Sequence, residues 1–403
     1  MALISVETAR DLLLQGADHL ELEDVPIGAA RDRILGRALE SRRTQPPFDA
    51  SAMDGYAVRA GDVSVVPAEL RVIGESAAGR GFAGAVGPGE AVRIFTGAPV
   101  PQGADTVVIQ ENVDVVGPAS ISLRQPGTKG RNIRAAGLDF SAGDTLLAAG
   151  TRLDWRKLSI AASMDYATLP VVRRPRVHVL ATGDELVPPG APRGPDQIVA
   201  SNSFGILAFA QALGAEVEDL GIAGDSRGEL TARIRTAIDR HPDILVTLGG
   251  ASVGDHDSVR EALQAVGVEQ TFWKVAMRPG KPLMFGRRGP VRVLGLPGNP
   301  VSSLVGALLF LRPLIAALLG EIGAPQQQDV PALLGKPLPP NDNRADYIRA
   351  DLELEPGRSP VAVPFDVQDS SMLRAFVEAR CLIVRQPHAA AAAAGDPCRV
   401  IVL

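Results

Sequence analysis

The sequence predicts a multidomain α/β protein, in which a parallel sheet covered by helices is joined to smaller β-rich units. Three observations support this class. Strand and helix patterns alternate regularly from Pro175 to about residue 320, β-prone runs separated by Gly and Pro turns occupy residues 45–140, and short β runs return after residue 325. Strands that alternate with helices form parallel sheets, whereas closely spaced short strands form small β units.

Composition limits the size and the class of the protein. The chain has 403 residues, too many for one core and enough for about two to four domains. Aromatic residues make up 4% of the chain and its net charge is −5. These values exclude a base-stacking surface and a global field that attracts nucleic acid or an anionic membrane. We expect no nucleic-acid and no membrane partner.

The number and spacing of the cysteines and histidines indicate which kind of metal site the protein can have, and the N-terminal residues indicate its cellular compartment. Two cysteines without a CxxC spacing and five scattered histidines predict neither a disulfide framework nor a zinc site. A metal here should be a hard ion on carboxylates, such as Mg²⁺. There is no signal-peptide pattern, and the longest apolar run, residues 305–320, contains Arg312 and Pro313 and is short for a bilayer span. We therefore expect a cytoplasmic protein.

The N-terminal part predicts a helical linker domain at residues 1–45 and 140–173, interrupted by a β-rich insertion at 46–139. Residues 5–40 have the pattern of two helices, the first capped by Ser5. Residues 151–164 are again helical in pattern. Between them lie the β-prone runs 68–74, 90–95, 105–110 and 119–124.

The α/β domain is expected at residues 174–325 and a C-terminal β domain at 326–403. Four strand–helix pairs succeed one another, at 175–182 and 201–214, 215–223 and 226–240, 243–248 and 256–267, and 291–296 and 301–319. Short β runs follow at 346–354, 381–386 and 398–403. Ligands of parallel sheets bind at the carboxyl ends of the strands, so the loops at 181–190, 249–257 and 296–304 should line the site.

These three loops combine backbone donors with carboxylates. The glycines at 249–250 and the helix start after Pro300 offer N–H groups to a phosphate, and Ser252 offers a hydroxyl. Nearby acids would hold a divalent cation that neutralises the phosphate; they are Glu185, Asp225 and Asp255. Taken singly, each loop is equally a plain strand-to-helix turn, and Asp225 is equally a helix N-cap.

Basic and acidic residues elsewhere are less specific. Lys274, Arg278 and Lys281 surround a Pro-Gly turn, where they form either an anion site or a solvated strand end. Asp54 stands in the segment "PPFDASAMDGYAV", whose spacing alone indicates only an Asx-type turn.

Seven segments in order resemble the molybdopterin molybdenumtransferase family, that is, bacterial MoeA and the E domain of gephyrin. They are "PPFDASAMDGYAV", "RIFTGAPVPQGADTVV", "GRNIRAAGLDFSAGD", "LATGDEL", "GGASVGDHD", "PGKP" and "LPGNPVSS". The resemblance implies an elongated four-part subunit with a molybdopterin-binding-like α/β unit and a C-terminal β barrel. It also implies a homodimer with its cleft between the α/β unit of one chain and the N-terminal parts of the other.

The same resemblance implies an activity and a set of residues. Adenylylated molybdopterin and molybdate would react with Mg²⁺ to yield molybdenum cofactor and AMP, and the pathway adenylyltransferase would be a contact partner. Its implied catalytic residues are Asp54, Thr96, Asp139, Glu185, Asp225 and Asp255, of which Glu185, Asp225 and Asp255 would hold the metal. Its implied substrate residues are Arg134, Gly249, Gly250, Ser252, Arg278, Lys281, Pro297, Gly298, Asn299, Pro300, Arg349 and Ser371, with Ser370 as the alternative to Ser371.

Three departures from the family pattern and two rival functions stay open at this point. Leu248 and Ala251 stand where the family commonly has serine and valine. Arg278 stands where a lysine is usual, which keeps the charge and changes the geometry, and "QDSSML" lacks the usual glycine. Another enzyme built on the same α/β module, such as an adenylyltransferase or a nucleotide pyrophosphatase, would explain residues 174–325 but not the N-terminal motifs. A non-enzymatic scaffold is the second rival; the chain shows no fused partner domain or long linker in its favour.

Overall fold

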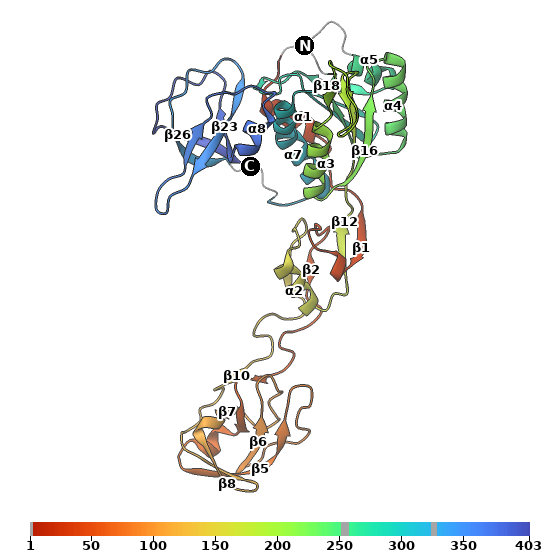
Figure 1. The fold of residues 1–403 in the computed structure, drawn as a ribbon. Coiled ribbons are helices and arrows are strands. Elements are labelled where there is room, and N and C mark those ends of the chain that lie inside the picture. The colour runs from red at the N-terminus through yellow and green to blue at the C-terminus, as the bar shows by residue number, and fades with distance from the viewer. Residues whose placement is uncertain (1–2, 251–257, 324–328) are drawn as a thin grey trace.

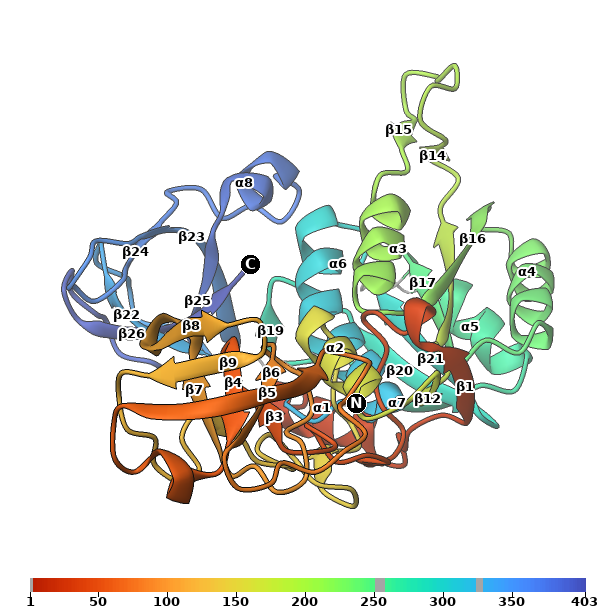
Figure 2. The same cartoon turned by 90° about the horizontal axis from the view of Figure 1, so that it is seen from below.

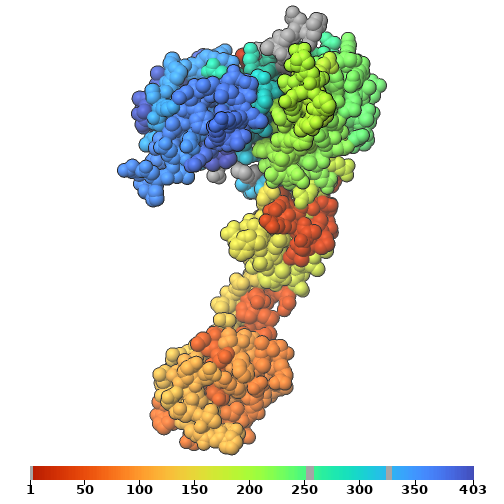
Figure 3. Space-filling model, viewed as in Figure 1, coloured from red at the N-terminus to blue at the C-terminus, as the bar shows by residue number. Residues whose placement is uncertain are grey.

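The computed structural model describes residues 3–250, 258–323 and 329–403, and shows an elongated chain. The α/β unit and the C-terminal barrel lie beside each other at one end, the inserted β unit lies at the other, and the linker lies between them (Figure 1; Figure 3). The inserted unit is therefore separated from the α/β sheet of its own chain by the length of the linker.

The α/β unit contains a six-stranded sheet in the order β16 (Glu216–Ala223), β13 (Arg176–Thr182), β17 (Ile244–Leu248), β21 (Val291–Leu296), β20 (Met284–Arg288) and β18 (Glu269–Trp273). The first four strands are parallel, as predicted, and the helices that follow strands in the chain include α3 (Asn202–Ala212), α4 (Arg227–Asp239) and α5 (Ser258–Ala265). Every residue of β17 is buried, as expected for a central parallel strand covered on both faces. The antiparallel pair β18 and β20 at one edge was not predicted.

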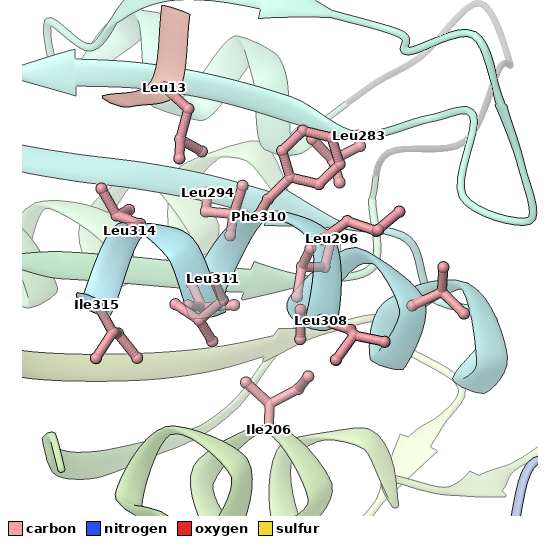
Figure 4. Close-up of a cluster of buried hydrophobic side chains, with 14 of the residues drawn as sticks. Leu13, Ile206, Leu283, Leu294, Leu296, Leu308, Phe310, Leu311, Leu314 and Ile315 are labelled. Carbon is pink, nitrogen blue, oxygen red and sulfur yellow. The ribbon is translucent and has the colours of Figure 1, made fainter. Parts of the chain in front are cut away.

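One continuous helical segment fills the core of this unit. It comprises α6 (Pro300–Gly306), a π-helical turn at Ala307–Leu311 and α7 (Arg312–Leu319). Pro313 has no N–H to donate, and the π turn just before it shifts the hydrogen-bond register of the helix. The segment has the length and composition of a membrane span, but most of it is buried inside the protein, where Phe310 packs near Leu294 and Leu296 of β21 (Figure 4).

The N-terminal helix belongs to this core and not to the linker, where we expected it. Helix α1 (Val6–Leu14) begins at Ser5, whose hydroxyl accepts a bond from the Thr8 N–H at 3.0 Å. Its buried face, which includes Leu13, packs in the same cluster as α7. The predicted second helix before residue 40 was wrong: β1 (Leu22–Pro26), the short η1 (Ile27–Ala29) and β2 (Leu39–Glu40) occupy that stretch.

The linker contains more β-strand residues than predicted. Its strands pair with partners far away in the sequence, and local patterns do not reveal such pairs. Strand β1 pairs antiparallel with β12 (Thr168–Val172), and β2 pairs with β11 (Thr145–Leu147). Its one described helix, α2 (Trp155–Ser163), is capped by Asp154, which accepts bonds from the N–H groups of the first turn. The linker has a small apolar core of its own.

The inserted unit is a six-stranded sheet, which agrees with the β-rich pattern. Its order is β7 (Thr106–Ile109), β4 (Gly55–Val58), β6 (Glu90–Ile94), β5 (Ala68–Ser76), β9 (Ser120–Leu123) and β8 (Val113–Gly117). A short pair, β3 (Ala50–Ser51) with β10 (Ile133–Arg134), lies outside this sheet, where the unit meets the linker. The 3-10 turns η2 (Ala60–Val63) and η3 (Gln110–Asn112) connect strands.

The C-terminal unit is a closed five-stranded barrel. Strands β23 (Ala345–Glu353), β24 (Val361–Pro364), β22 (Val330–Leu334), β26 (Pro397–Val402) and β25 (Cys381–Arg385) follow one another around it, and β25 pairs back with β23. The short β19 (Met277–Arg278) from the α/β unit adds to β23, and α8 (Leu373–Glu378) lies on the side facing α6. A narrow finger formed by β14 (Leu186–Val187) and β15 (Ile198–Val199) projects from the α/β unit (Figure 2).

Candidate active site

A cavity of about 670 Å³ lies at the carboxyl edge of the sheet, where the sequence placed the site. All three predicted loops contribute to it, together with the base of the β14–β15 finger and the start of α3. Ser371 reaches it from the C-terminal unit. Its lining includes Thr182, Gly183, Glu185, Ile198, Ser201, Asn202, Asp225, Gly249, Gly250, Ser258, Pro282, Pro297, Gly298, Asn299, Pro300 and Ser371.

The turn after β17 requires glycine at two successive positions. Gly249 and Gly250 have φ values of 99° and 65°, which side-chain-bearing residues rarely adopt. A Cβ on Gly249 would lie 2.5 Å from the carbonyl oxygen of Thr182, and one on Gly250 would lie 1.9 Å from Cγ2 of Val259. The chain therefore turns flat against β13. The Gly249 N–H donates to the Leu296 carbonyl at 3.1 Å, whereas the Gly250 N–H makes no bond to the described residues and stays open to a ligand in the cavity.

The loop at Pro297–Pro300 forms the neighbouring wall and leads into α6. The Asn202 side chain of α3 donates to the carbonyl of Gly298 at 2.7 Å. Asn299 occupies the N-cap position without a capping side-chain bond; instead, its amide donates to the Ser370 hydroxyl at 2.9 Å. These bonds fix the loop. At the start of α6, Pro300 has no N–H and the Val301 N–H donates to the Ser370 carbonyl at 3.1 Å, so the N–H groups of Gly298 and Asn299, which make no bond to the described residues, are the ones open to an anion.

Carboxylates border this phosphate-type cradle on one side. The carboxylate of Asp184 accepts from the N–H of Asp225 at 3.0 Å, and that of Asp225 accepts from the N–H of Asp184 at 3.4 Å. Glu185 lines the cavity beside them. Ser226, and not Asp225, caps α4 by accepting from the Glu229 N–H, so the alternative role for Asp225 as N-cap is wrong.

This donor set fits Mg²⁺ in part. Carboxylate oxygens suit a hard cation, and Mg²⁺ is usually bound by one or two carboxylates together with substrate phosphates. Outside residues 251–257 and the other omitted segments, no group of three or more acidic, histidine or cysteine side chains gathers closely enough to hold a metal. Asp255 and Ser252 lie outside the described residues. Glu185 and Asp225 are the described candidates.

The two predicted arginines of the oxyanion site are engaged by protein partners. Arg278 pairs with Asp346, its register partner across β19 and β23, at 2.5 Å, and this contact raises the pKa of its guanidinium. Arg349 is 1% exposed; it donates to the Gln368 side chain at 3.2 Å and to the Asp369 carbonyl at 2.8 Å, and burial lowers its pKa. Arg349 thus supports the segment before Ser371.

The remaining residues of the oxyanion site divide between the cavity and its edge. The hydroxyl of Ser371 donates to Asp369 at 2.6 Å, which lowers the pKa of that carboxyl, whereas Ser370 holds Asn299. Of the two serines, Ser371 is the one that lines the cavity. Lys281 is half-buried next to the lining residue Pro282 and has no ion-pair partner in the described chain.

Four predicted residues lie in the inserted unit or beside the linker, away from this cavity. Asp54 accepts bonds from the N–H and the hydroxyl of Thr96 at 2.7 and 2.8 Å, which hold its pKa below the ordinary value. Arg134 and Asp139 are exposed where the inserted unit joins the linker. None of the four lines the cavity of its own chain.

Comparison with known proteins decides the family. The MoeA N-terminal region (domain I and II) matches residues 4–164, a probable molybdopterin binding domain matches 178–317, and the MoeA C-terminal region (domain IV) matches 331–403. The chain is 35% identical over 397 residues to the molybdopterin molybdenumtransferase of Haemophilus influenzae, covering 98% of this chain and 97% of that protein. The chain belongs to the molybdopterin molybdenumtransferase family.

Other relatives agree with this membership. Molybdopterin molybdenumtransferase 2 of Mycobacterium tuberculosis is 39% identical over 345 residues, which cover 83% of this chain and 84% of that one. A solved molybdopterin biosynthesis MoeA protein from Pyrococcus horikoshii superposes with a TM-score of 0.88 at 29% identity, covering 100% of this chain and 99% of that chain. The predicted fold class and the prediction of a transferase of molybdenum cofactor biosynthesis are confirmed.

Two residues beyond those predicted for the site also shape the cavity of this molybdenumtransferase. Asn202 holds the Gly298 carbonyl, and Asp184 exchanges bonds with Asp225. A polar residue at the start of the helix after β13 was a usable signal for Asn202, because that helix start also faces the carboxyl edge. Asp184 stood next to Glu185 in the quoted loop and was not included among the site residues.

Proposed function

We propose that the cavity binds adenylylated molybdopterin and that the enzyme inserts molybdate into it, releasing molybdenum cofactor and AMP. One observation carries this proposal: a backbone cradle at Gly249–Gly250 and Gly298–Asn299 lies against the exposed carboxylates of Glu185 and Asp225. Donors alone would suit any phosphate. Donors beside acids suit a phosphoanhydride that is bound together with a divalent cation.

The residues divide the work by their chemistry. The N–H groups of Gly250, Gly298 and Asn299, which make no bond to the described residues, orient the phosphates. Glu185 and Asp225 would hold Mg²⁺, which supplies positive charge at the phosphoanhydride when it is bound. Lys281, which has no ion-pair partner among the described residues, and Ser371 are the groups left to receive molybdate, because Arg278 is bound to Asp346 and Arg349 is buried beneath the segment that carries Ser371.

The separation of the Asp54–Thr96 pair from the cavity supports a homodimer. The inserted unit lies at the far end of the chain (Figure 1). If this pair acts on the substrate, it reaches the cavity of a second copy, and a two-fold dimer lets both copies do so at once. We extend the proposal to a cytoplasmic enzyme that receives its adenylylated substrate from the pathway adenylyltransferase.

The test is molybdate-dependent AMP release. Purified protein, adenylylated molybdopterin, Mg²⁺ and increasing molybdate should give AMP in step with molybdenum cofactor. Lys281→Ala should raise the molybdate concentration needed by about tenfold to a hundredfold, because a charged contact is typically worth about 1.5–3 kcal/mol. Lys336→Ala, which removes a half-exposed lysine of the barrel paired with Asp366, is the matched control. AMP release at the same rate without molybdate would indicate a pyrophosphatase instead.

A further inference from the structure

A second cavity, of about 540 Å³, lies where the linker meets the α/β unit, apart from the active-site cavity. The linker contributes Arg31, Asp32 and Arg152 to its lining, and the α/β side contributes Arg174, Arg312 and Glu321, along with apolar residues of α3 and α7. Its volume is in the range of small-ligand pockets. No residue of the proposed active site lines it.

The charges of this cavity do not balance. Four arginines face two carboxylates, and each carboxylate already has its own partner. Glu321 takes both bonds from Arg152, at 2.6 and 2.7 Å, and Asp32 pairs with Arg31 at 3.4 Å. Arg174 and Arg312 make no ion pair within the described residues. Two guanidinium groups therefore remain without a counter-charge in a partly enclosed space.

The two unmatched arginines also keep unused hydrogen-bond donors. The Nε–H of Arg312 is buried without an acceptor, and burial lowers the pKa of this guanidinium. Arg174 donates one bond, from Nη1 to the carbonyl of Gly214 at 3.1 Å. A Cβ built on Gly214 would lie 3.8 Å from Nη1 of Arg152 and 3.9 Å from Nη1 of Arg174, so these two guanidinium groups converge on one spot. Apart from that Arg174 bond, the N–H groups of Arg174 and Arg312 donate to no acceptor among the described residues, so those that face the cavity are the donors an anion would use.

We infer that this cavity is a binding site for a small multivalent oxyanion of the phosphate type. Planar guanidinium groups bind tetrahedral and carboxylate oxyanions through paired N–H donors. The bound anion would take its direct bonds from Arg174 and Arg312 of the α/β unit and would lie beside Arg152 of the linker, whose own charge is paired with Glu321. Anion binding would therefore reduce motion at this boundary. The boundary determines the orientation of the linker and its inserted unit relative to the α/β unit. The inference is independent of the proposed reaction.

Inorganic phosphate is the first probe, titrated into the full chain by calorimetry in a phosphate-free buffer. Arg174→Gln and Arg312→Gln should each weaken binding at this site at least about tenfold, as expected for the loss of a charged donor. Arg174→Lys, which keeps the charge, should retain part of the affinity. Arg358→Gln removes an exposed arginine of the barrel and should leave binding unchanged.

Hydrogen–deuterium exchange locates the anion. Phosphate should protect amides in residues 211–214 and 29–33, and this protection should be lost in both glutamine variants. Protection confined to residues 297–300 would place the anion in the active-site cavity and overturn the inference. Saturable binding that is unchanged in both variants, or the absence of saturable binding to the wild-type protein, would also overturn it. Melting curves monitored by circular dichroism check that each variant is folded, and the two arginine positions provide independent tests.

Discussion

The acids of the inserted unit and the acids of the α/β cavity are held in different ways. Asp54 accepts two short bonds from Thr96, one of them from the backbone. Asp225 accepts one long bond of 3.4 Å, and the Glu185 carboxylate accepts none from the described residues. The first carboxylate is satisfied by its own chain and kept ionised. The second pair has unused oxygens, which is the condition expected of groups that bind a cation together with a substrate.

The largest expected effect tests whether the two regions work across a dimer. Asp54→Ala and Asp225→Ala should each abolish most turnover. When the two variants are co-expressed with different tags, the mixed dimer would contain one intact cleft and one doubly altered cleft, and should regain about half of the wild-type activity. The measurement is AMP release by the doubly purified species.

A mixed dimer that stays inactive would show that Asp54 serves the cavity of its own chain. Normal turnover by Asp54→Ala alone would show that Asp54 has no role in the reaction. Light scattering gives an independent check, because a species of 42.2 kDa at micromolar concentration would be a monomer and would contradict the shared cleft.

The next effect concerns the cation. Asp225→Asn keeps the size of the side chain and removes its charge, so Mg²⁺-dependent turnover should fall at least about tenfold, equivalent to about 1.4 kcal/mol of transition-state stabilisation. Excess Mg²⁺ should restore part of the activity, as measured by initial rates over a Mg²⁺ series.

The neighbouring cap provides the control for that experiment. Ser226→Ala removes the hydroxyl that caps α4 and should lower the free energy of unfolding by about 1 kcal/mol, while the Mg²⁺ dependence of turnover stays normal. An Asp225→Asn variant with a normal Mg²⁺ dependence would mean that this carboxylate only shapes its loop.

The smallest effect concerns the pKa of Asp54. Thr96→Val removes the hydroxyl bond and leaves the backbone N–H bond, which is the larger cause of the lowered pKa. The pKa of Asp54 should therefore rise toward its ordinary value without reaching it. Because the pKa is lowered in the folded state, its contribution to stability is present above the unfolded pKa and is lost as the pH falls through the folded one. Carbon-13 NMR titration of the carboxyl measures this shift.

Thr96→Ser keeps the hydroxyl and is the matched control, whose titration should follow the wild-type curve. An unchanged pKa of Asp54 in Thr96→Val would show that the backbone bond alone sets it. Neutral pH lies above the unfolded pKa, where the stability that comes from the lowered pKa is present, so Thr96→Val should be less stable than the wild-type protein there, and this difference should shrink as the pH falls through the folded pKa.

Much of the fold was readable from the sequence because local patterns carry it. The apolar run of β17 predicted a buried strand, and the Gly249–Gly250 turn after it predicted an open backbone loop. Both signals depend on residues within one element. The order of strand and helix then placed the three loops on one edge of a sheet, since carboxyl ends of parallel strands meet there.

The errors occurred where a partner lies far along the chain. Residues 22–26 form β1 because they pair with β12, about 145 residues later in the chain. Helix α1 is part of the α/β unit and not of the linker, because its apolar face packs in the α/β core. No local period reveals either partner, and β structure in particular depends on its cross-strand neighbours.

The sequence by itself determined which chemical groups meet at the sheet edge: the backbone of the glycine turn and of the Pro297–Pro300 loop, and the carboxylates of Glu185 and Asp225. Only the tertiary structure decided which charged groups remain available. Arg349 is occupied beneath the Ser371 segment, and Arg278 is bound by Asp346, 68 residues away in the chain. The physical reason is that a charge is read from its residue type, whereas its availability depends on burial and on partners that only folding brings within hydrogen-bond distance.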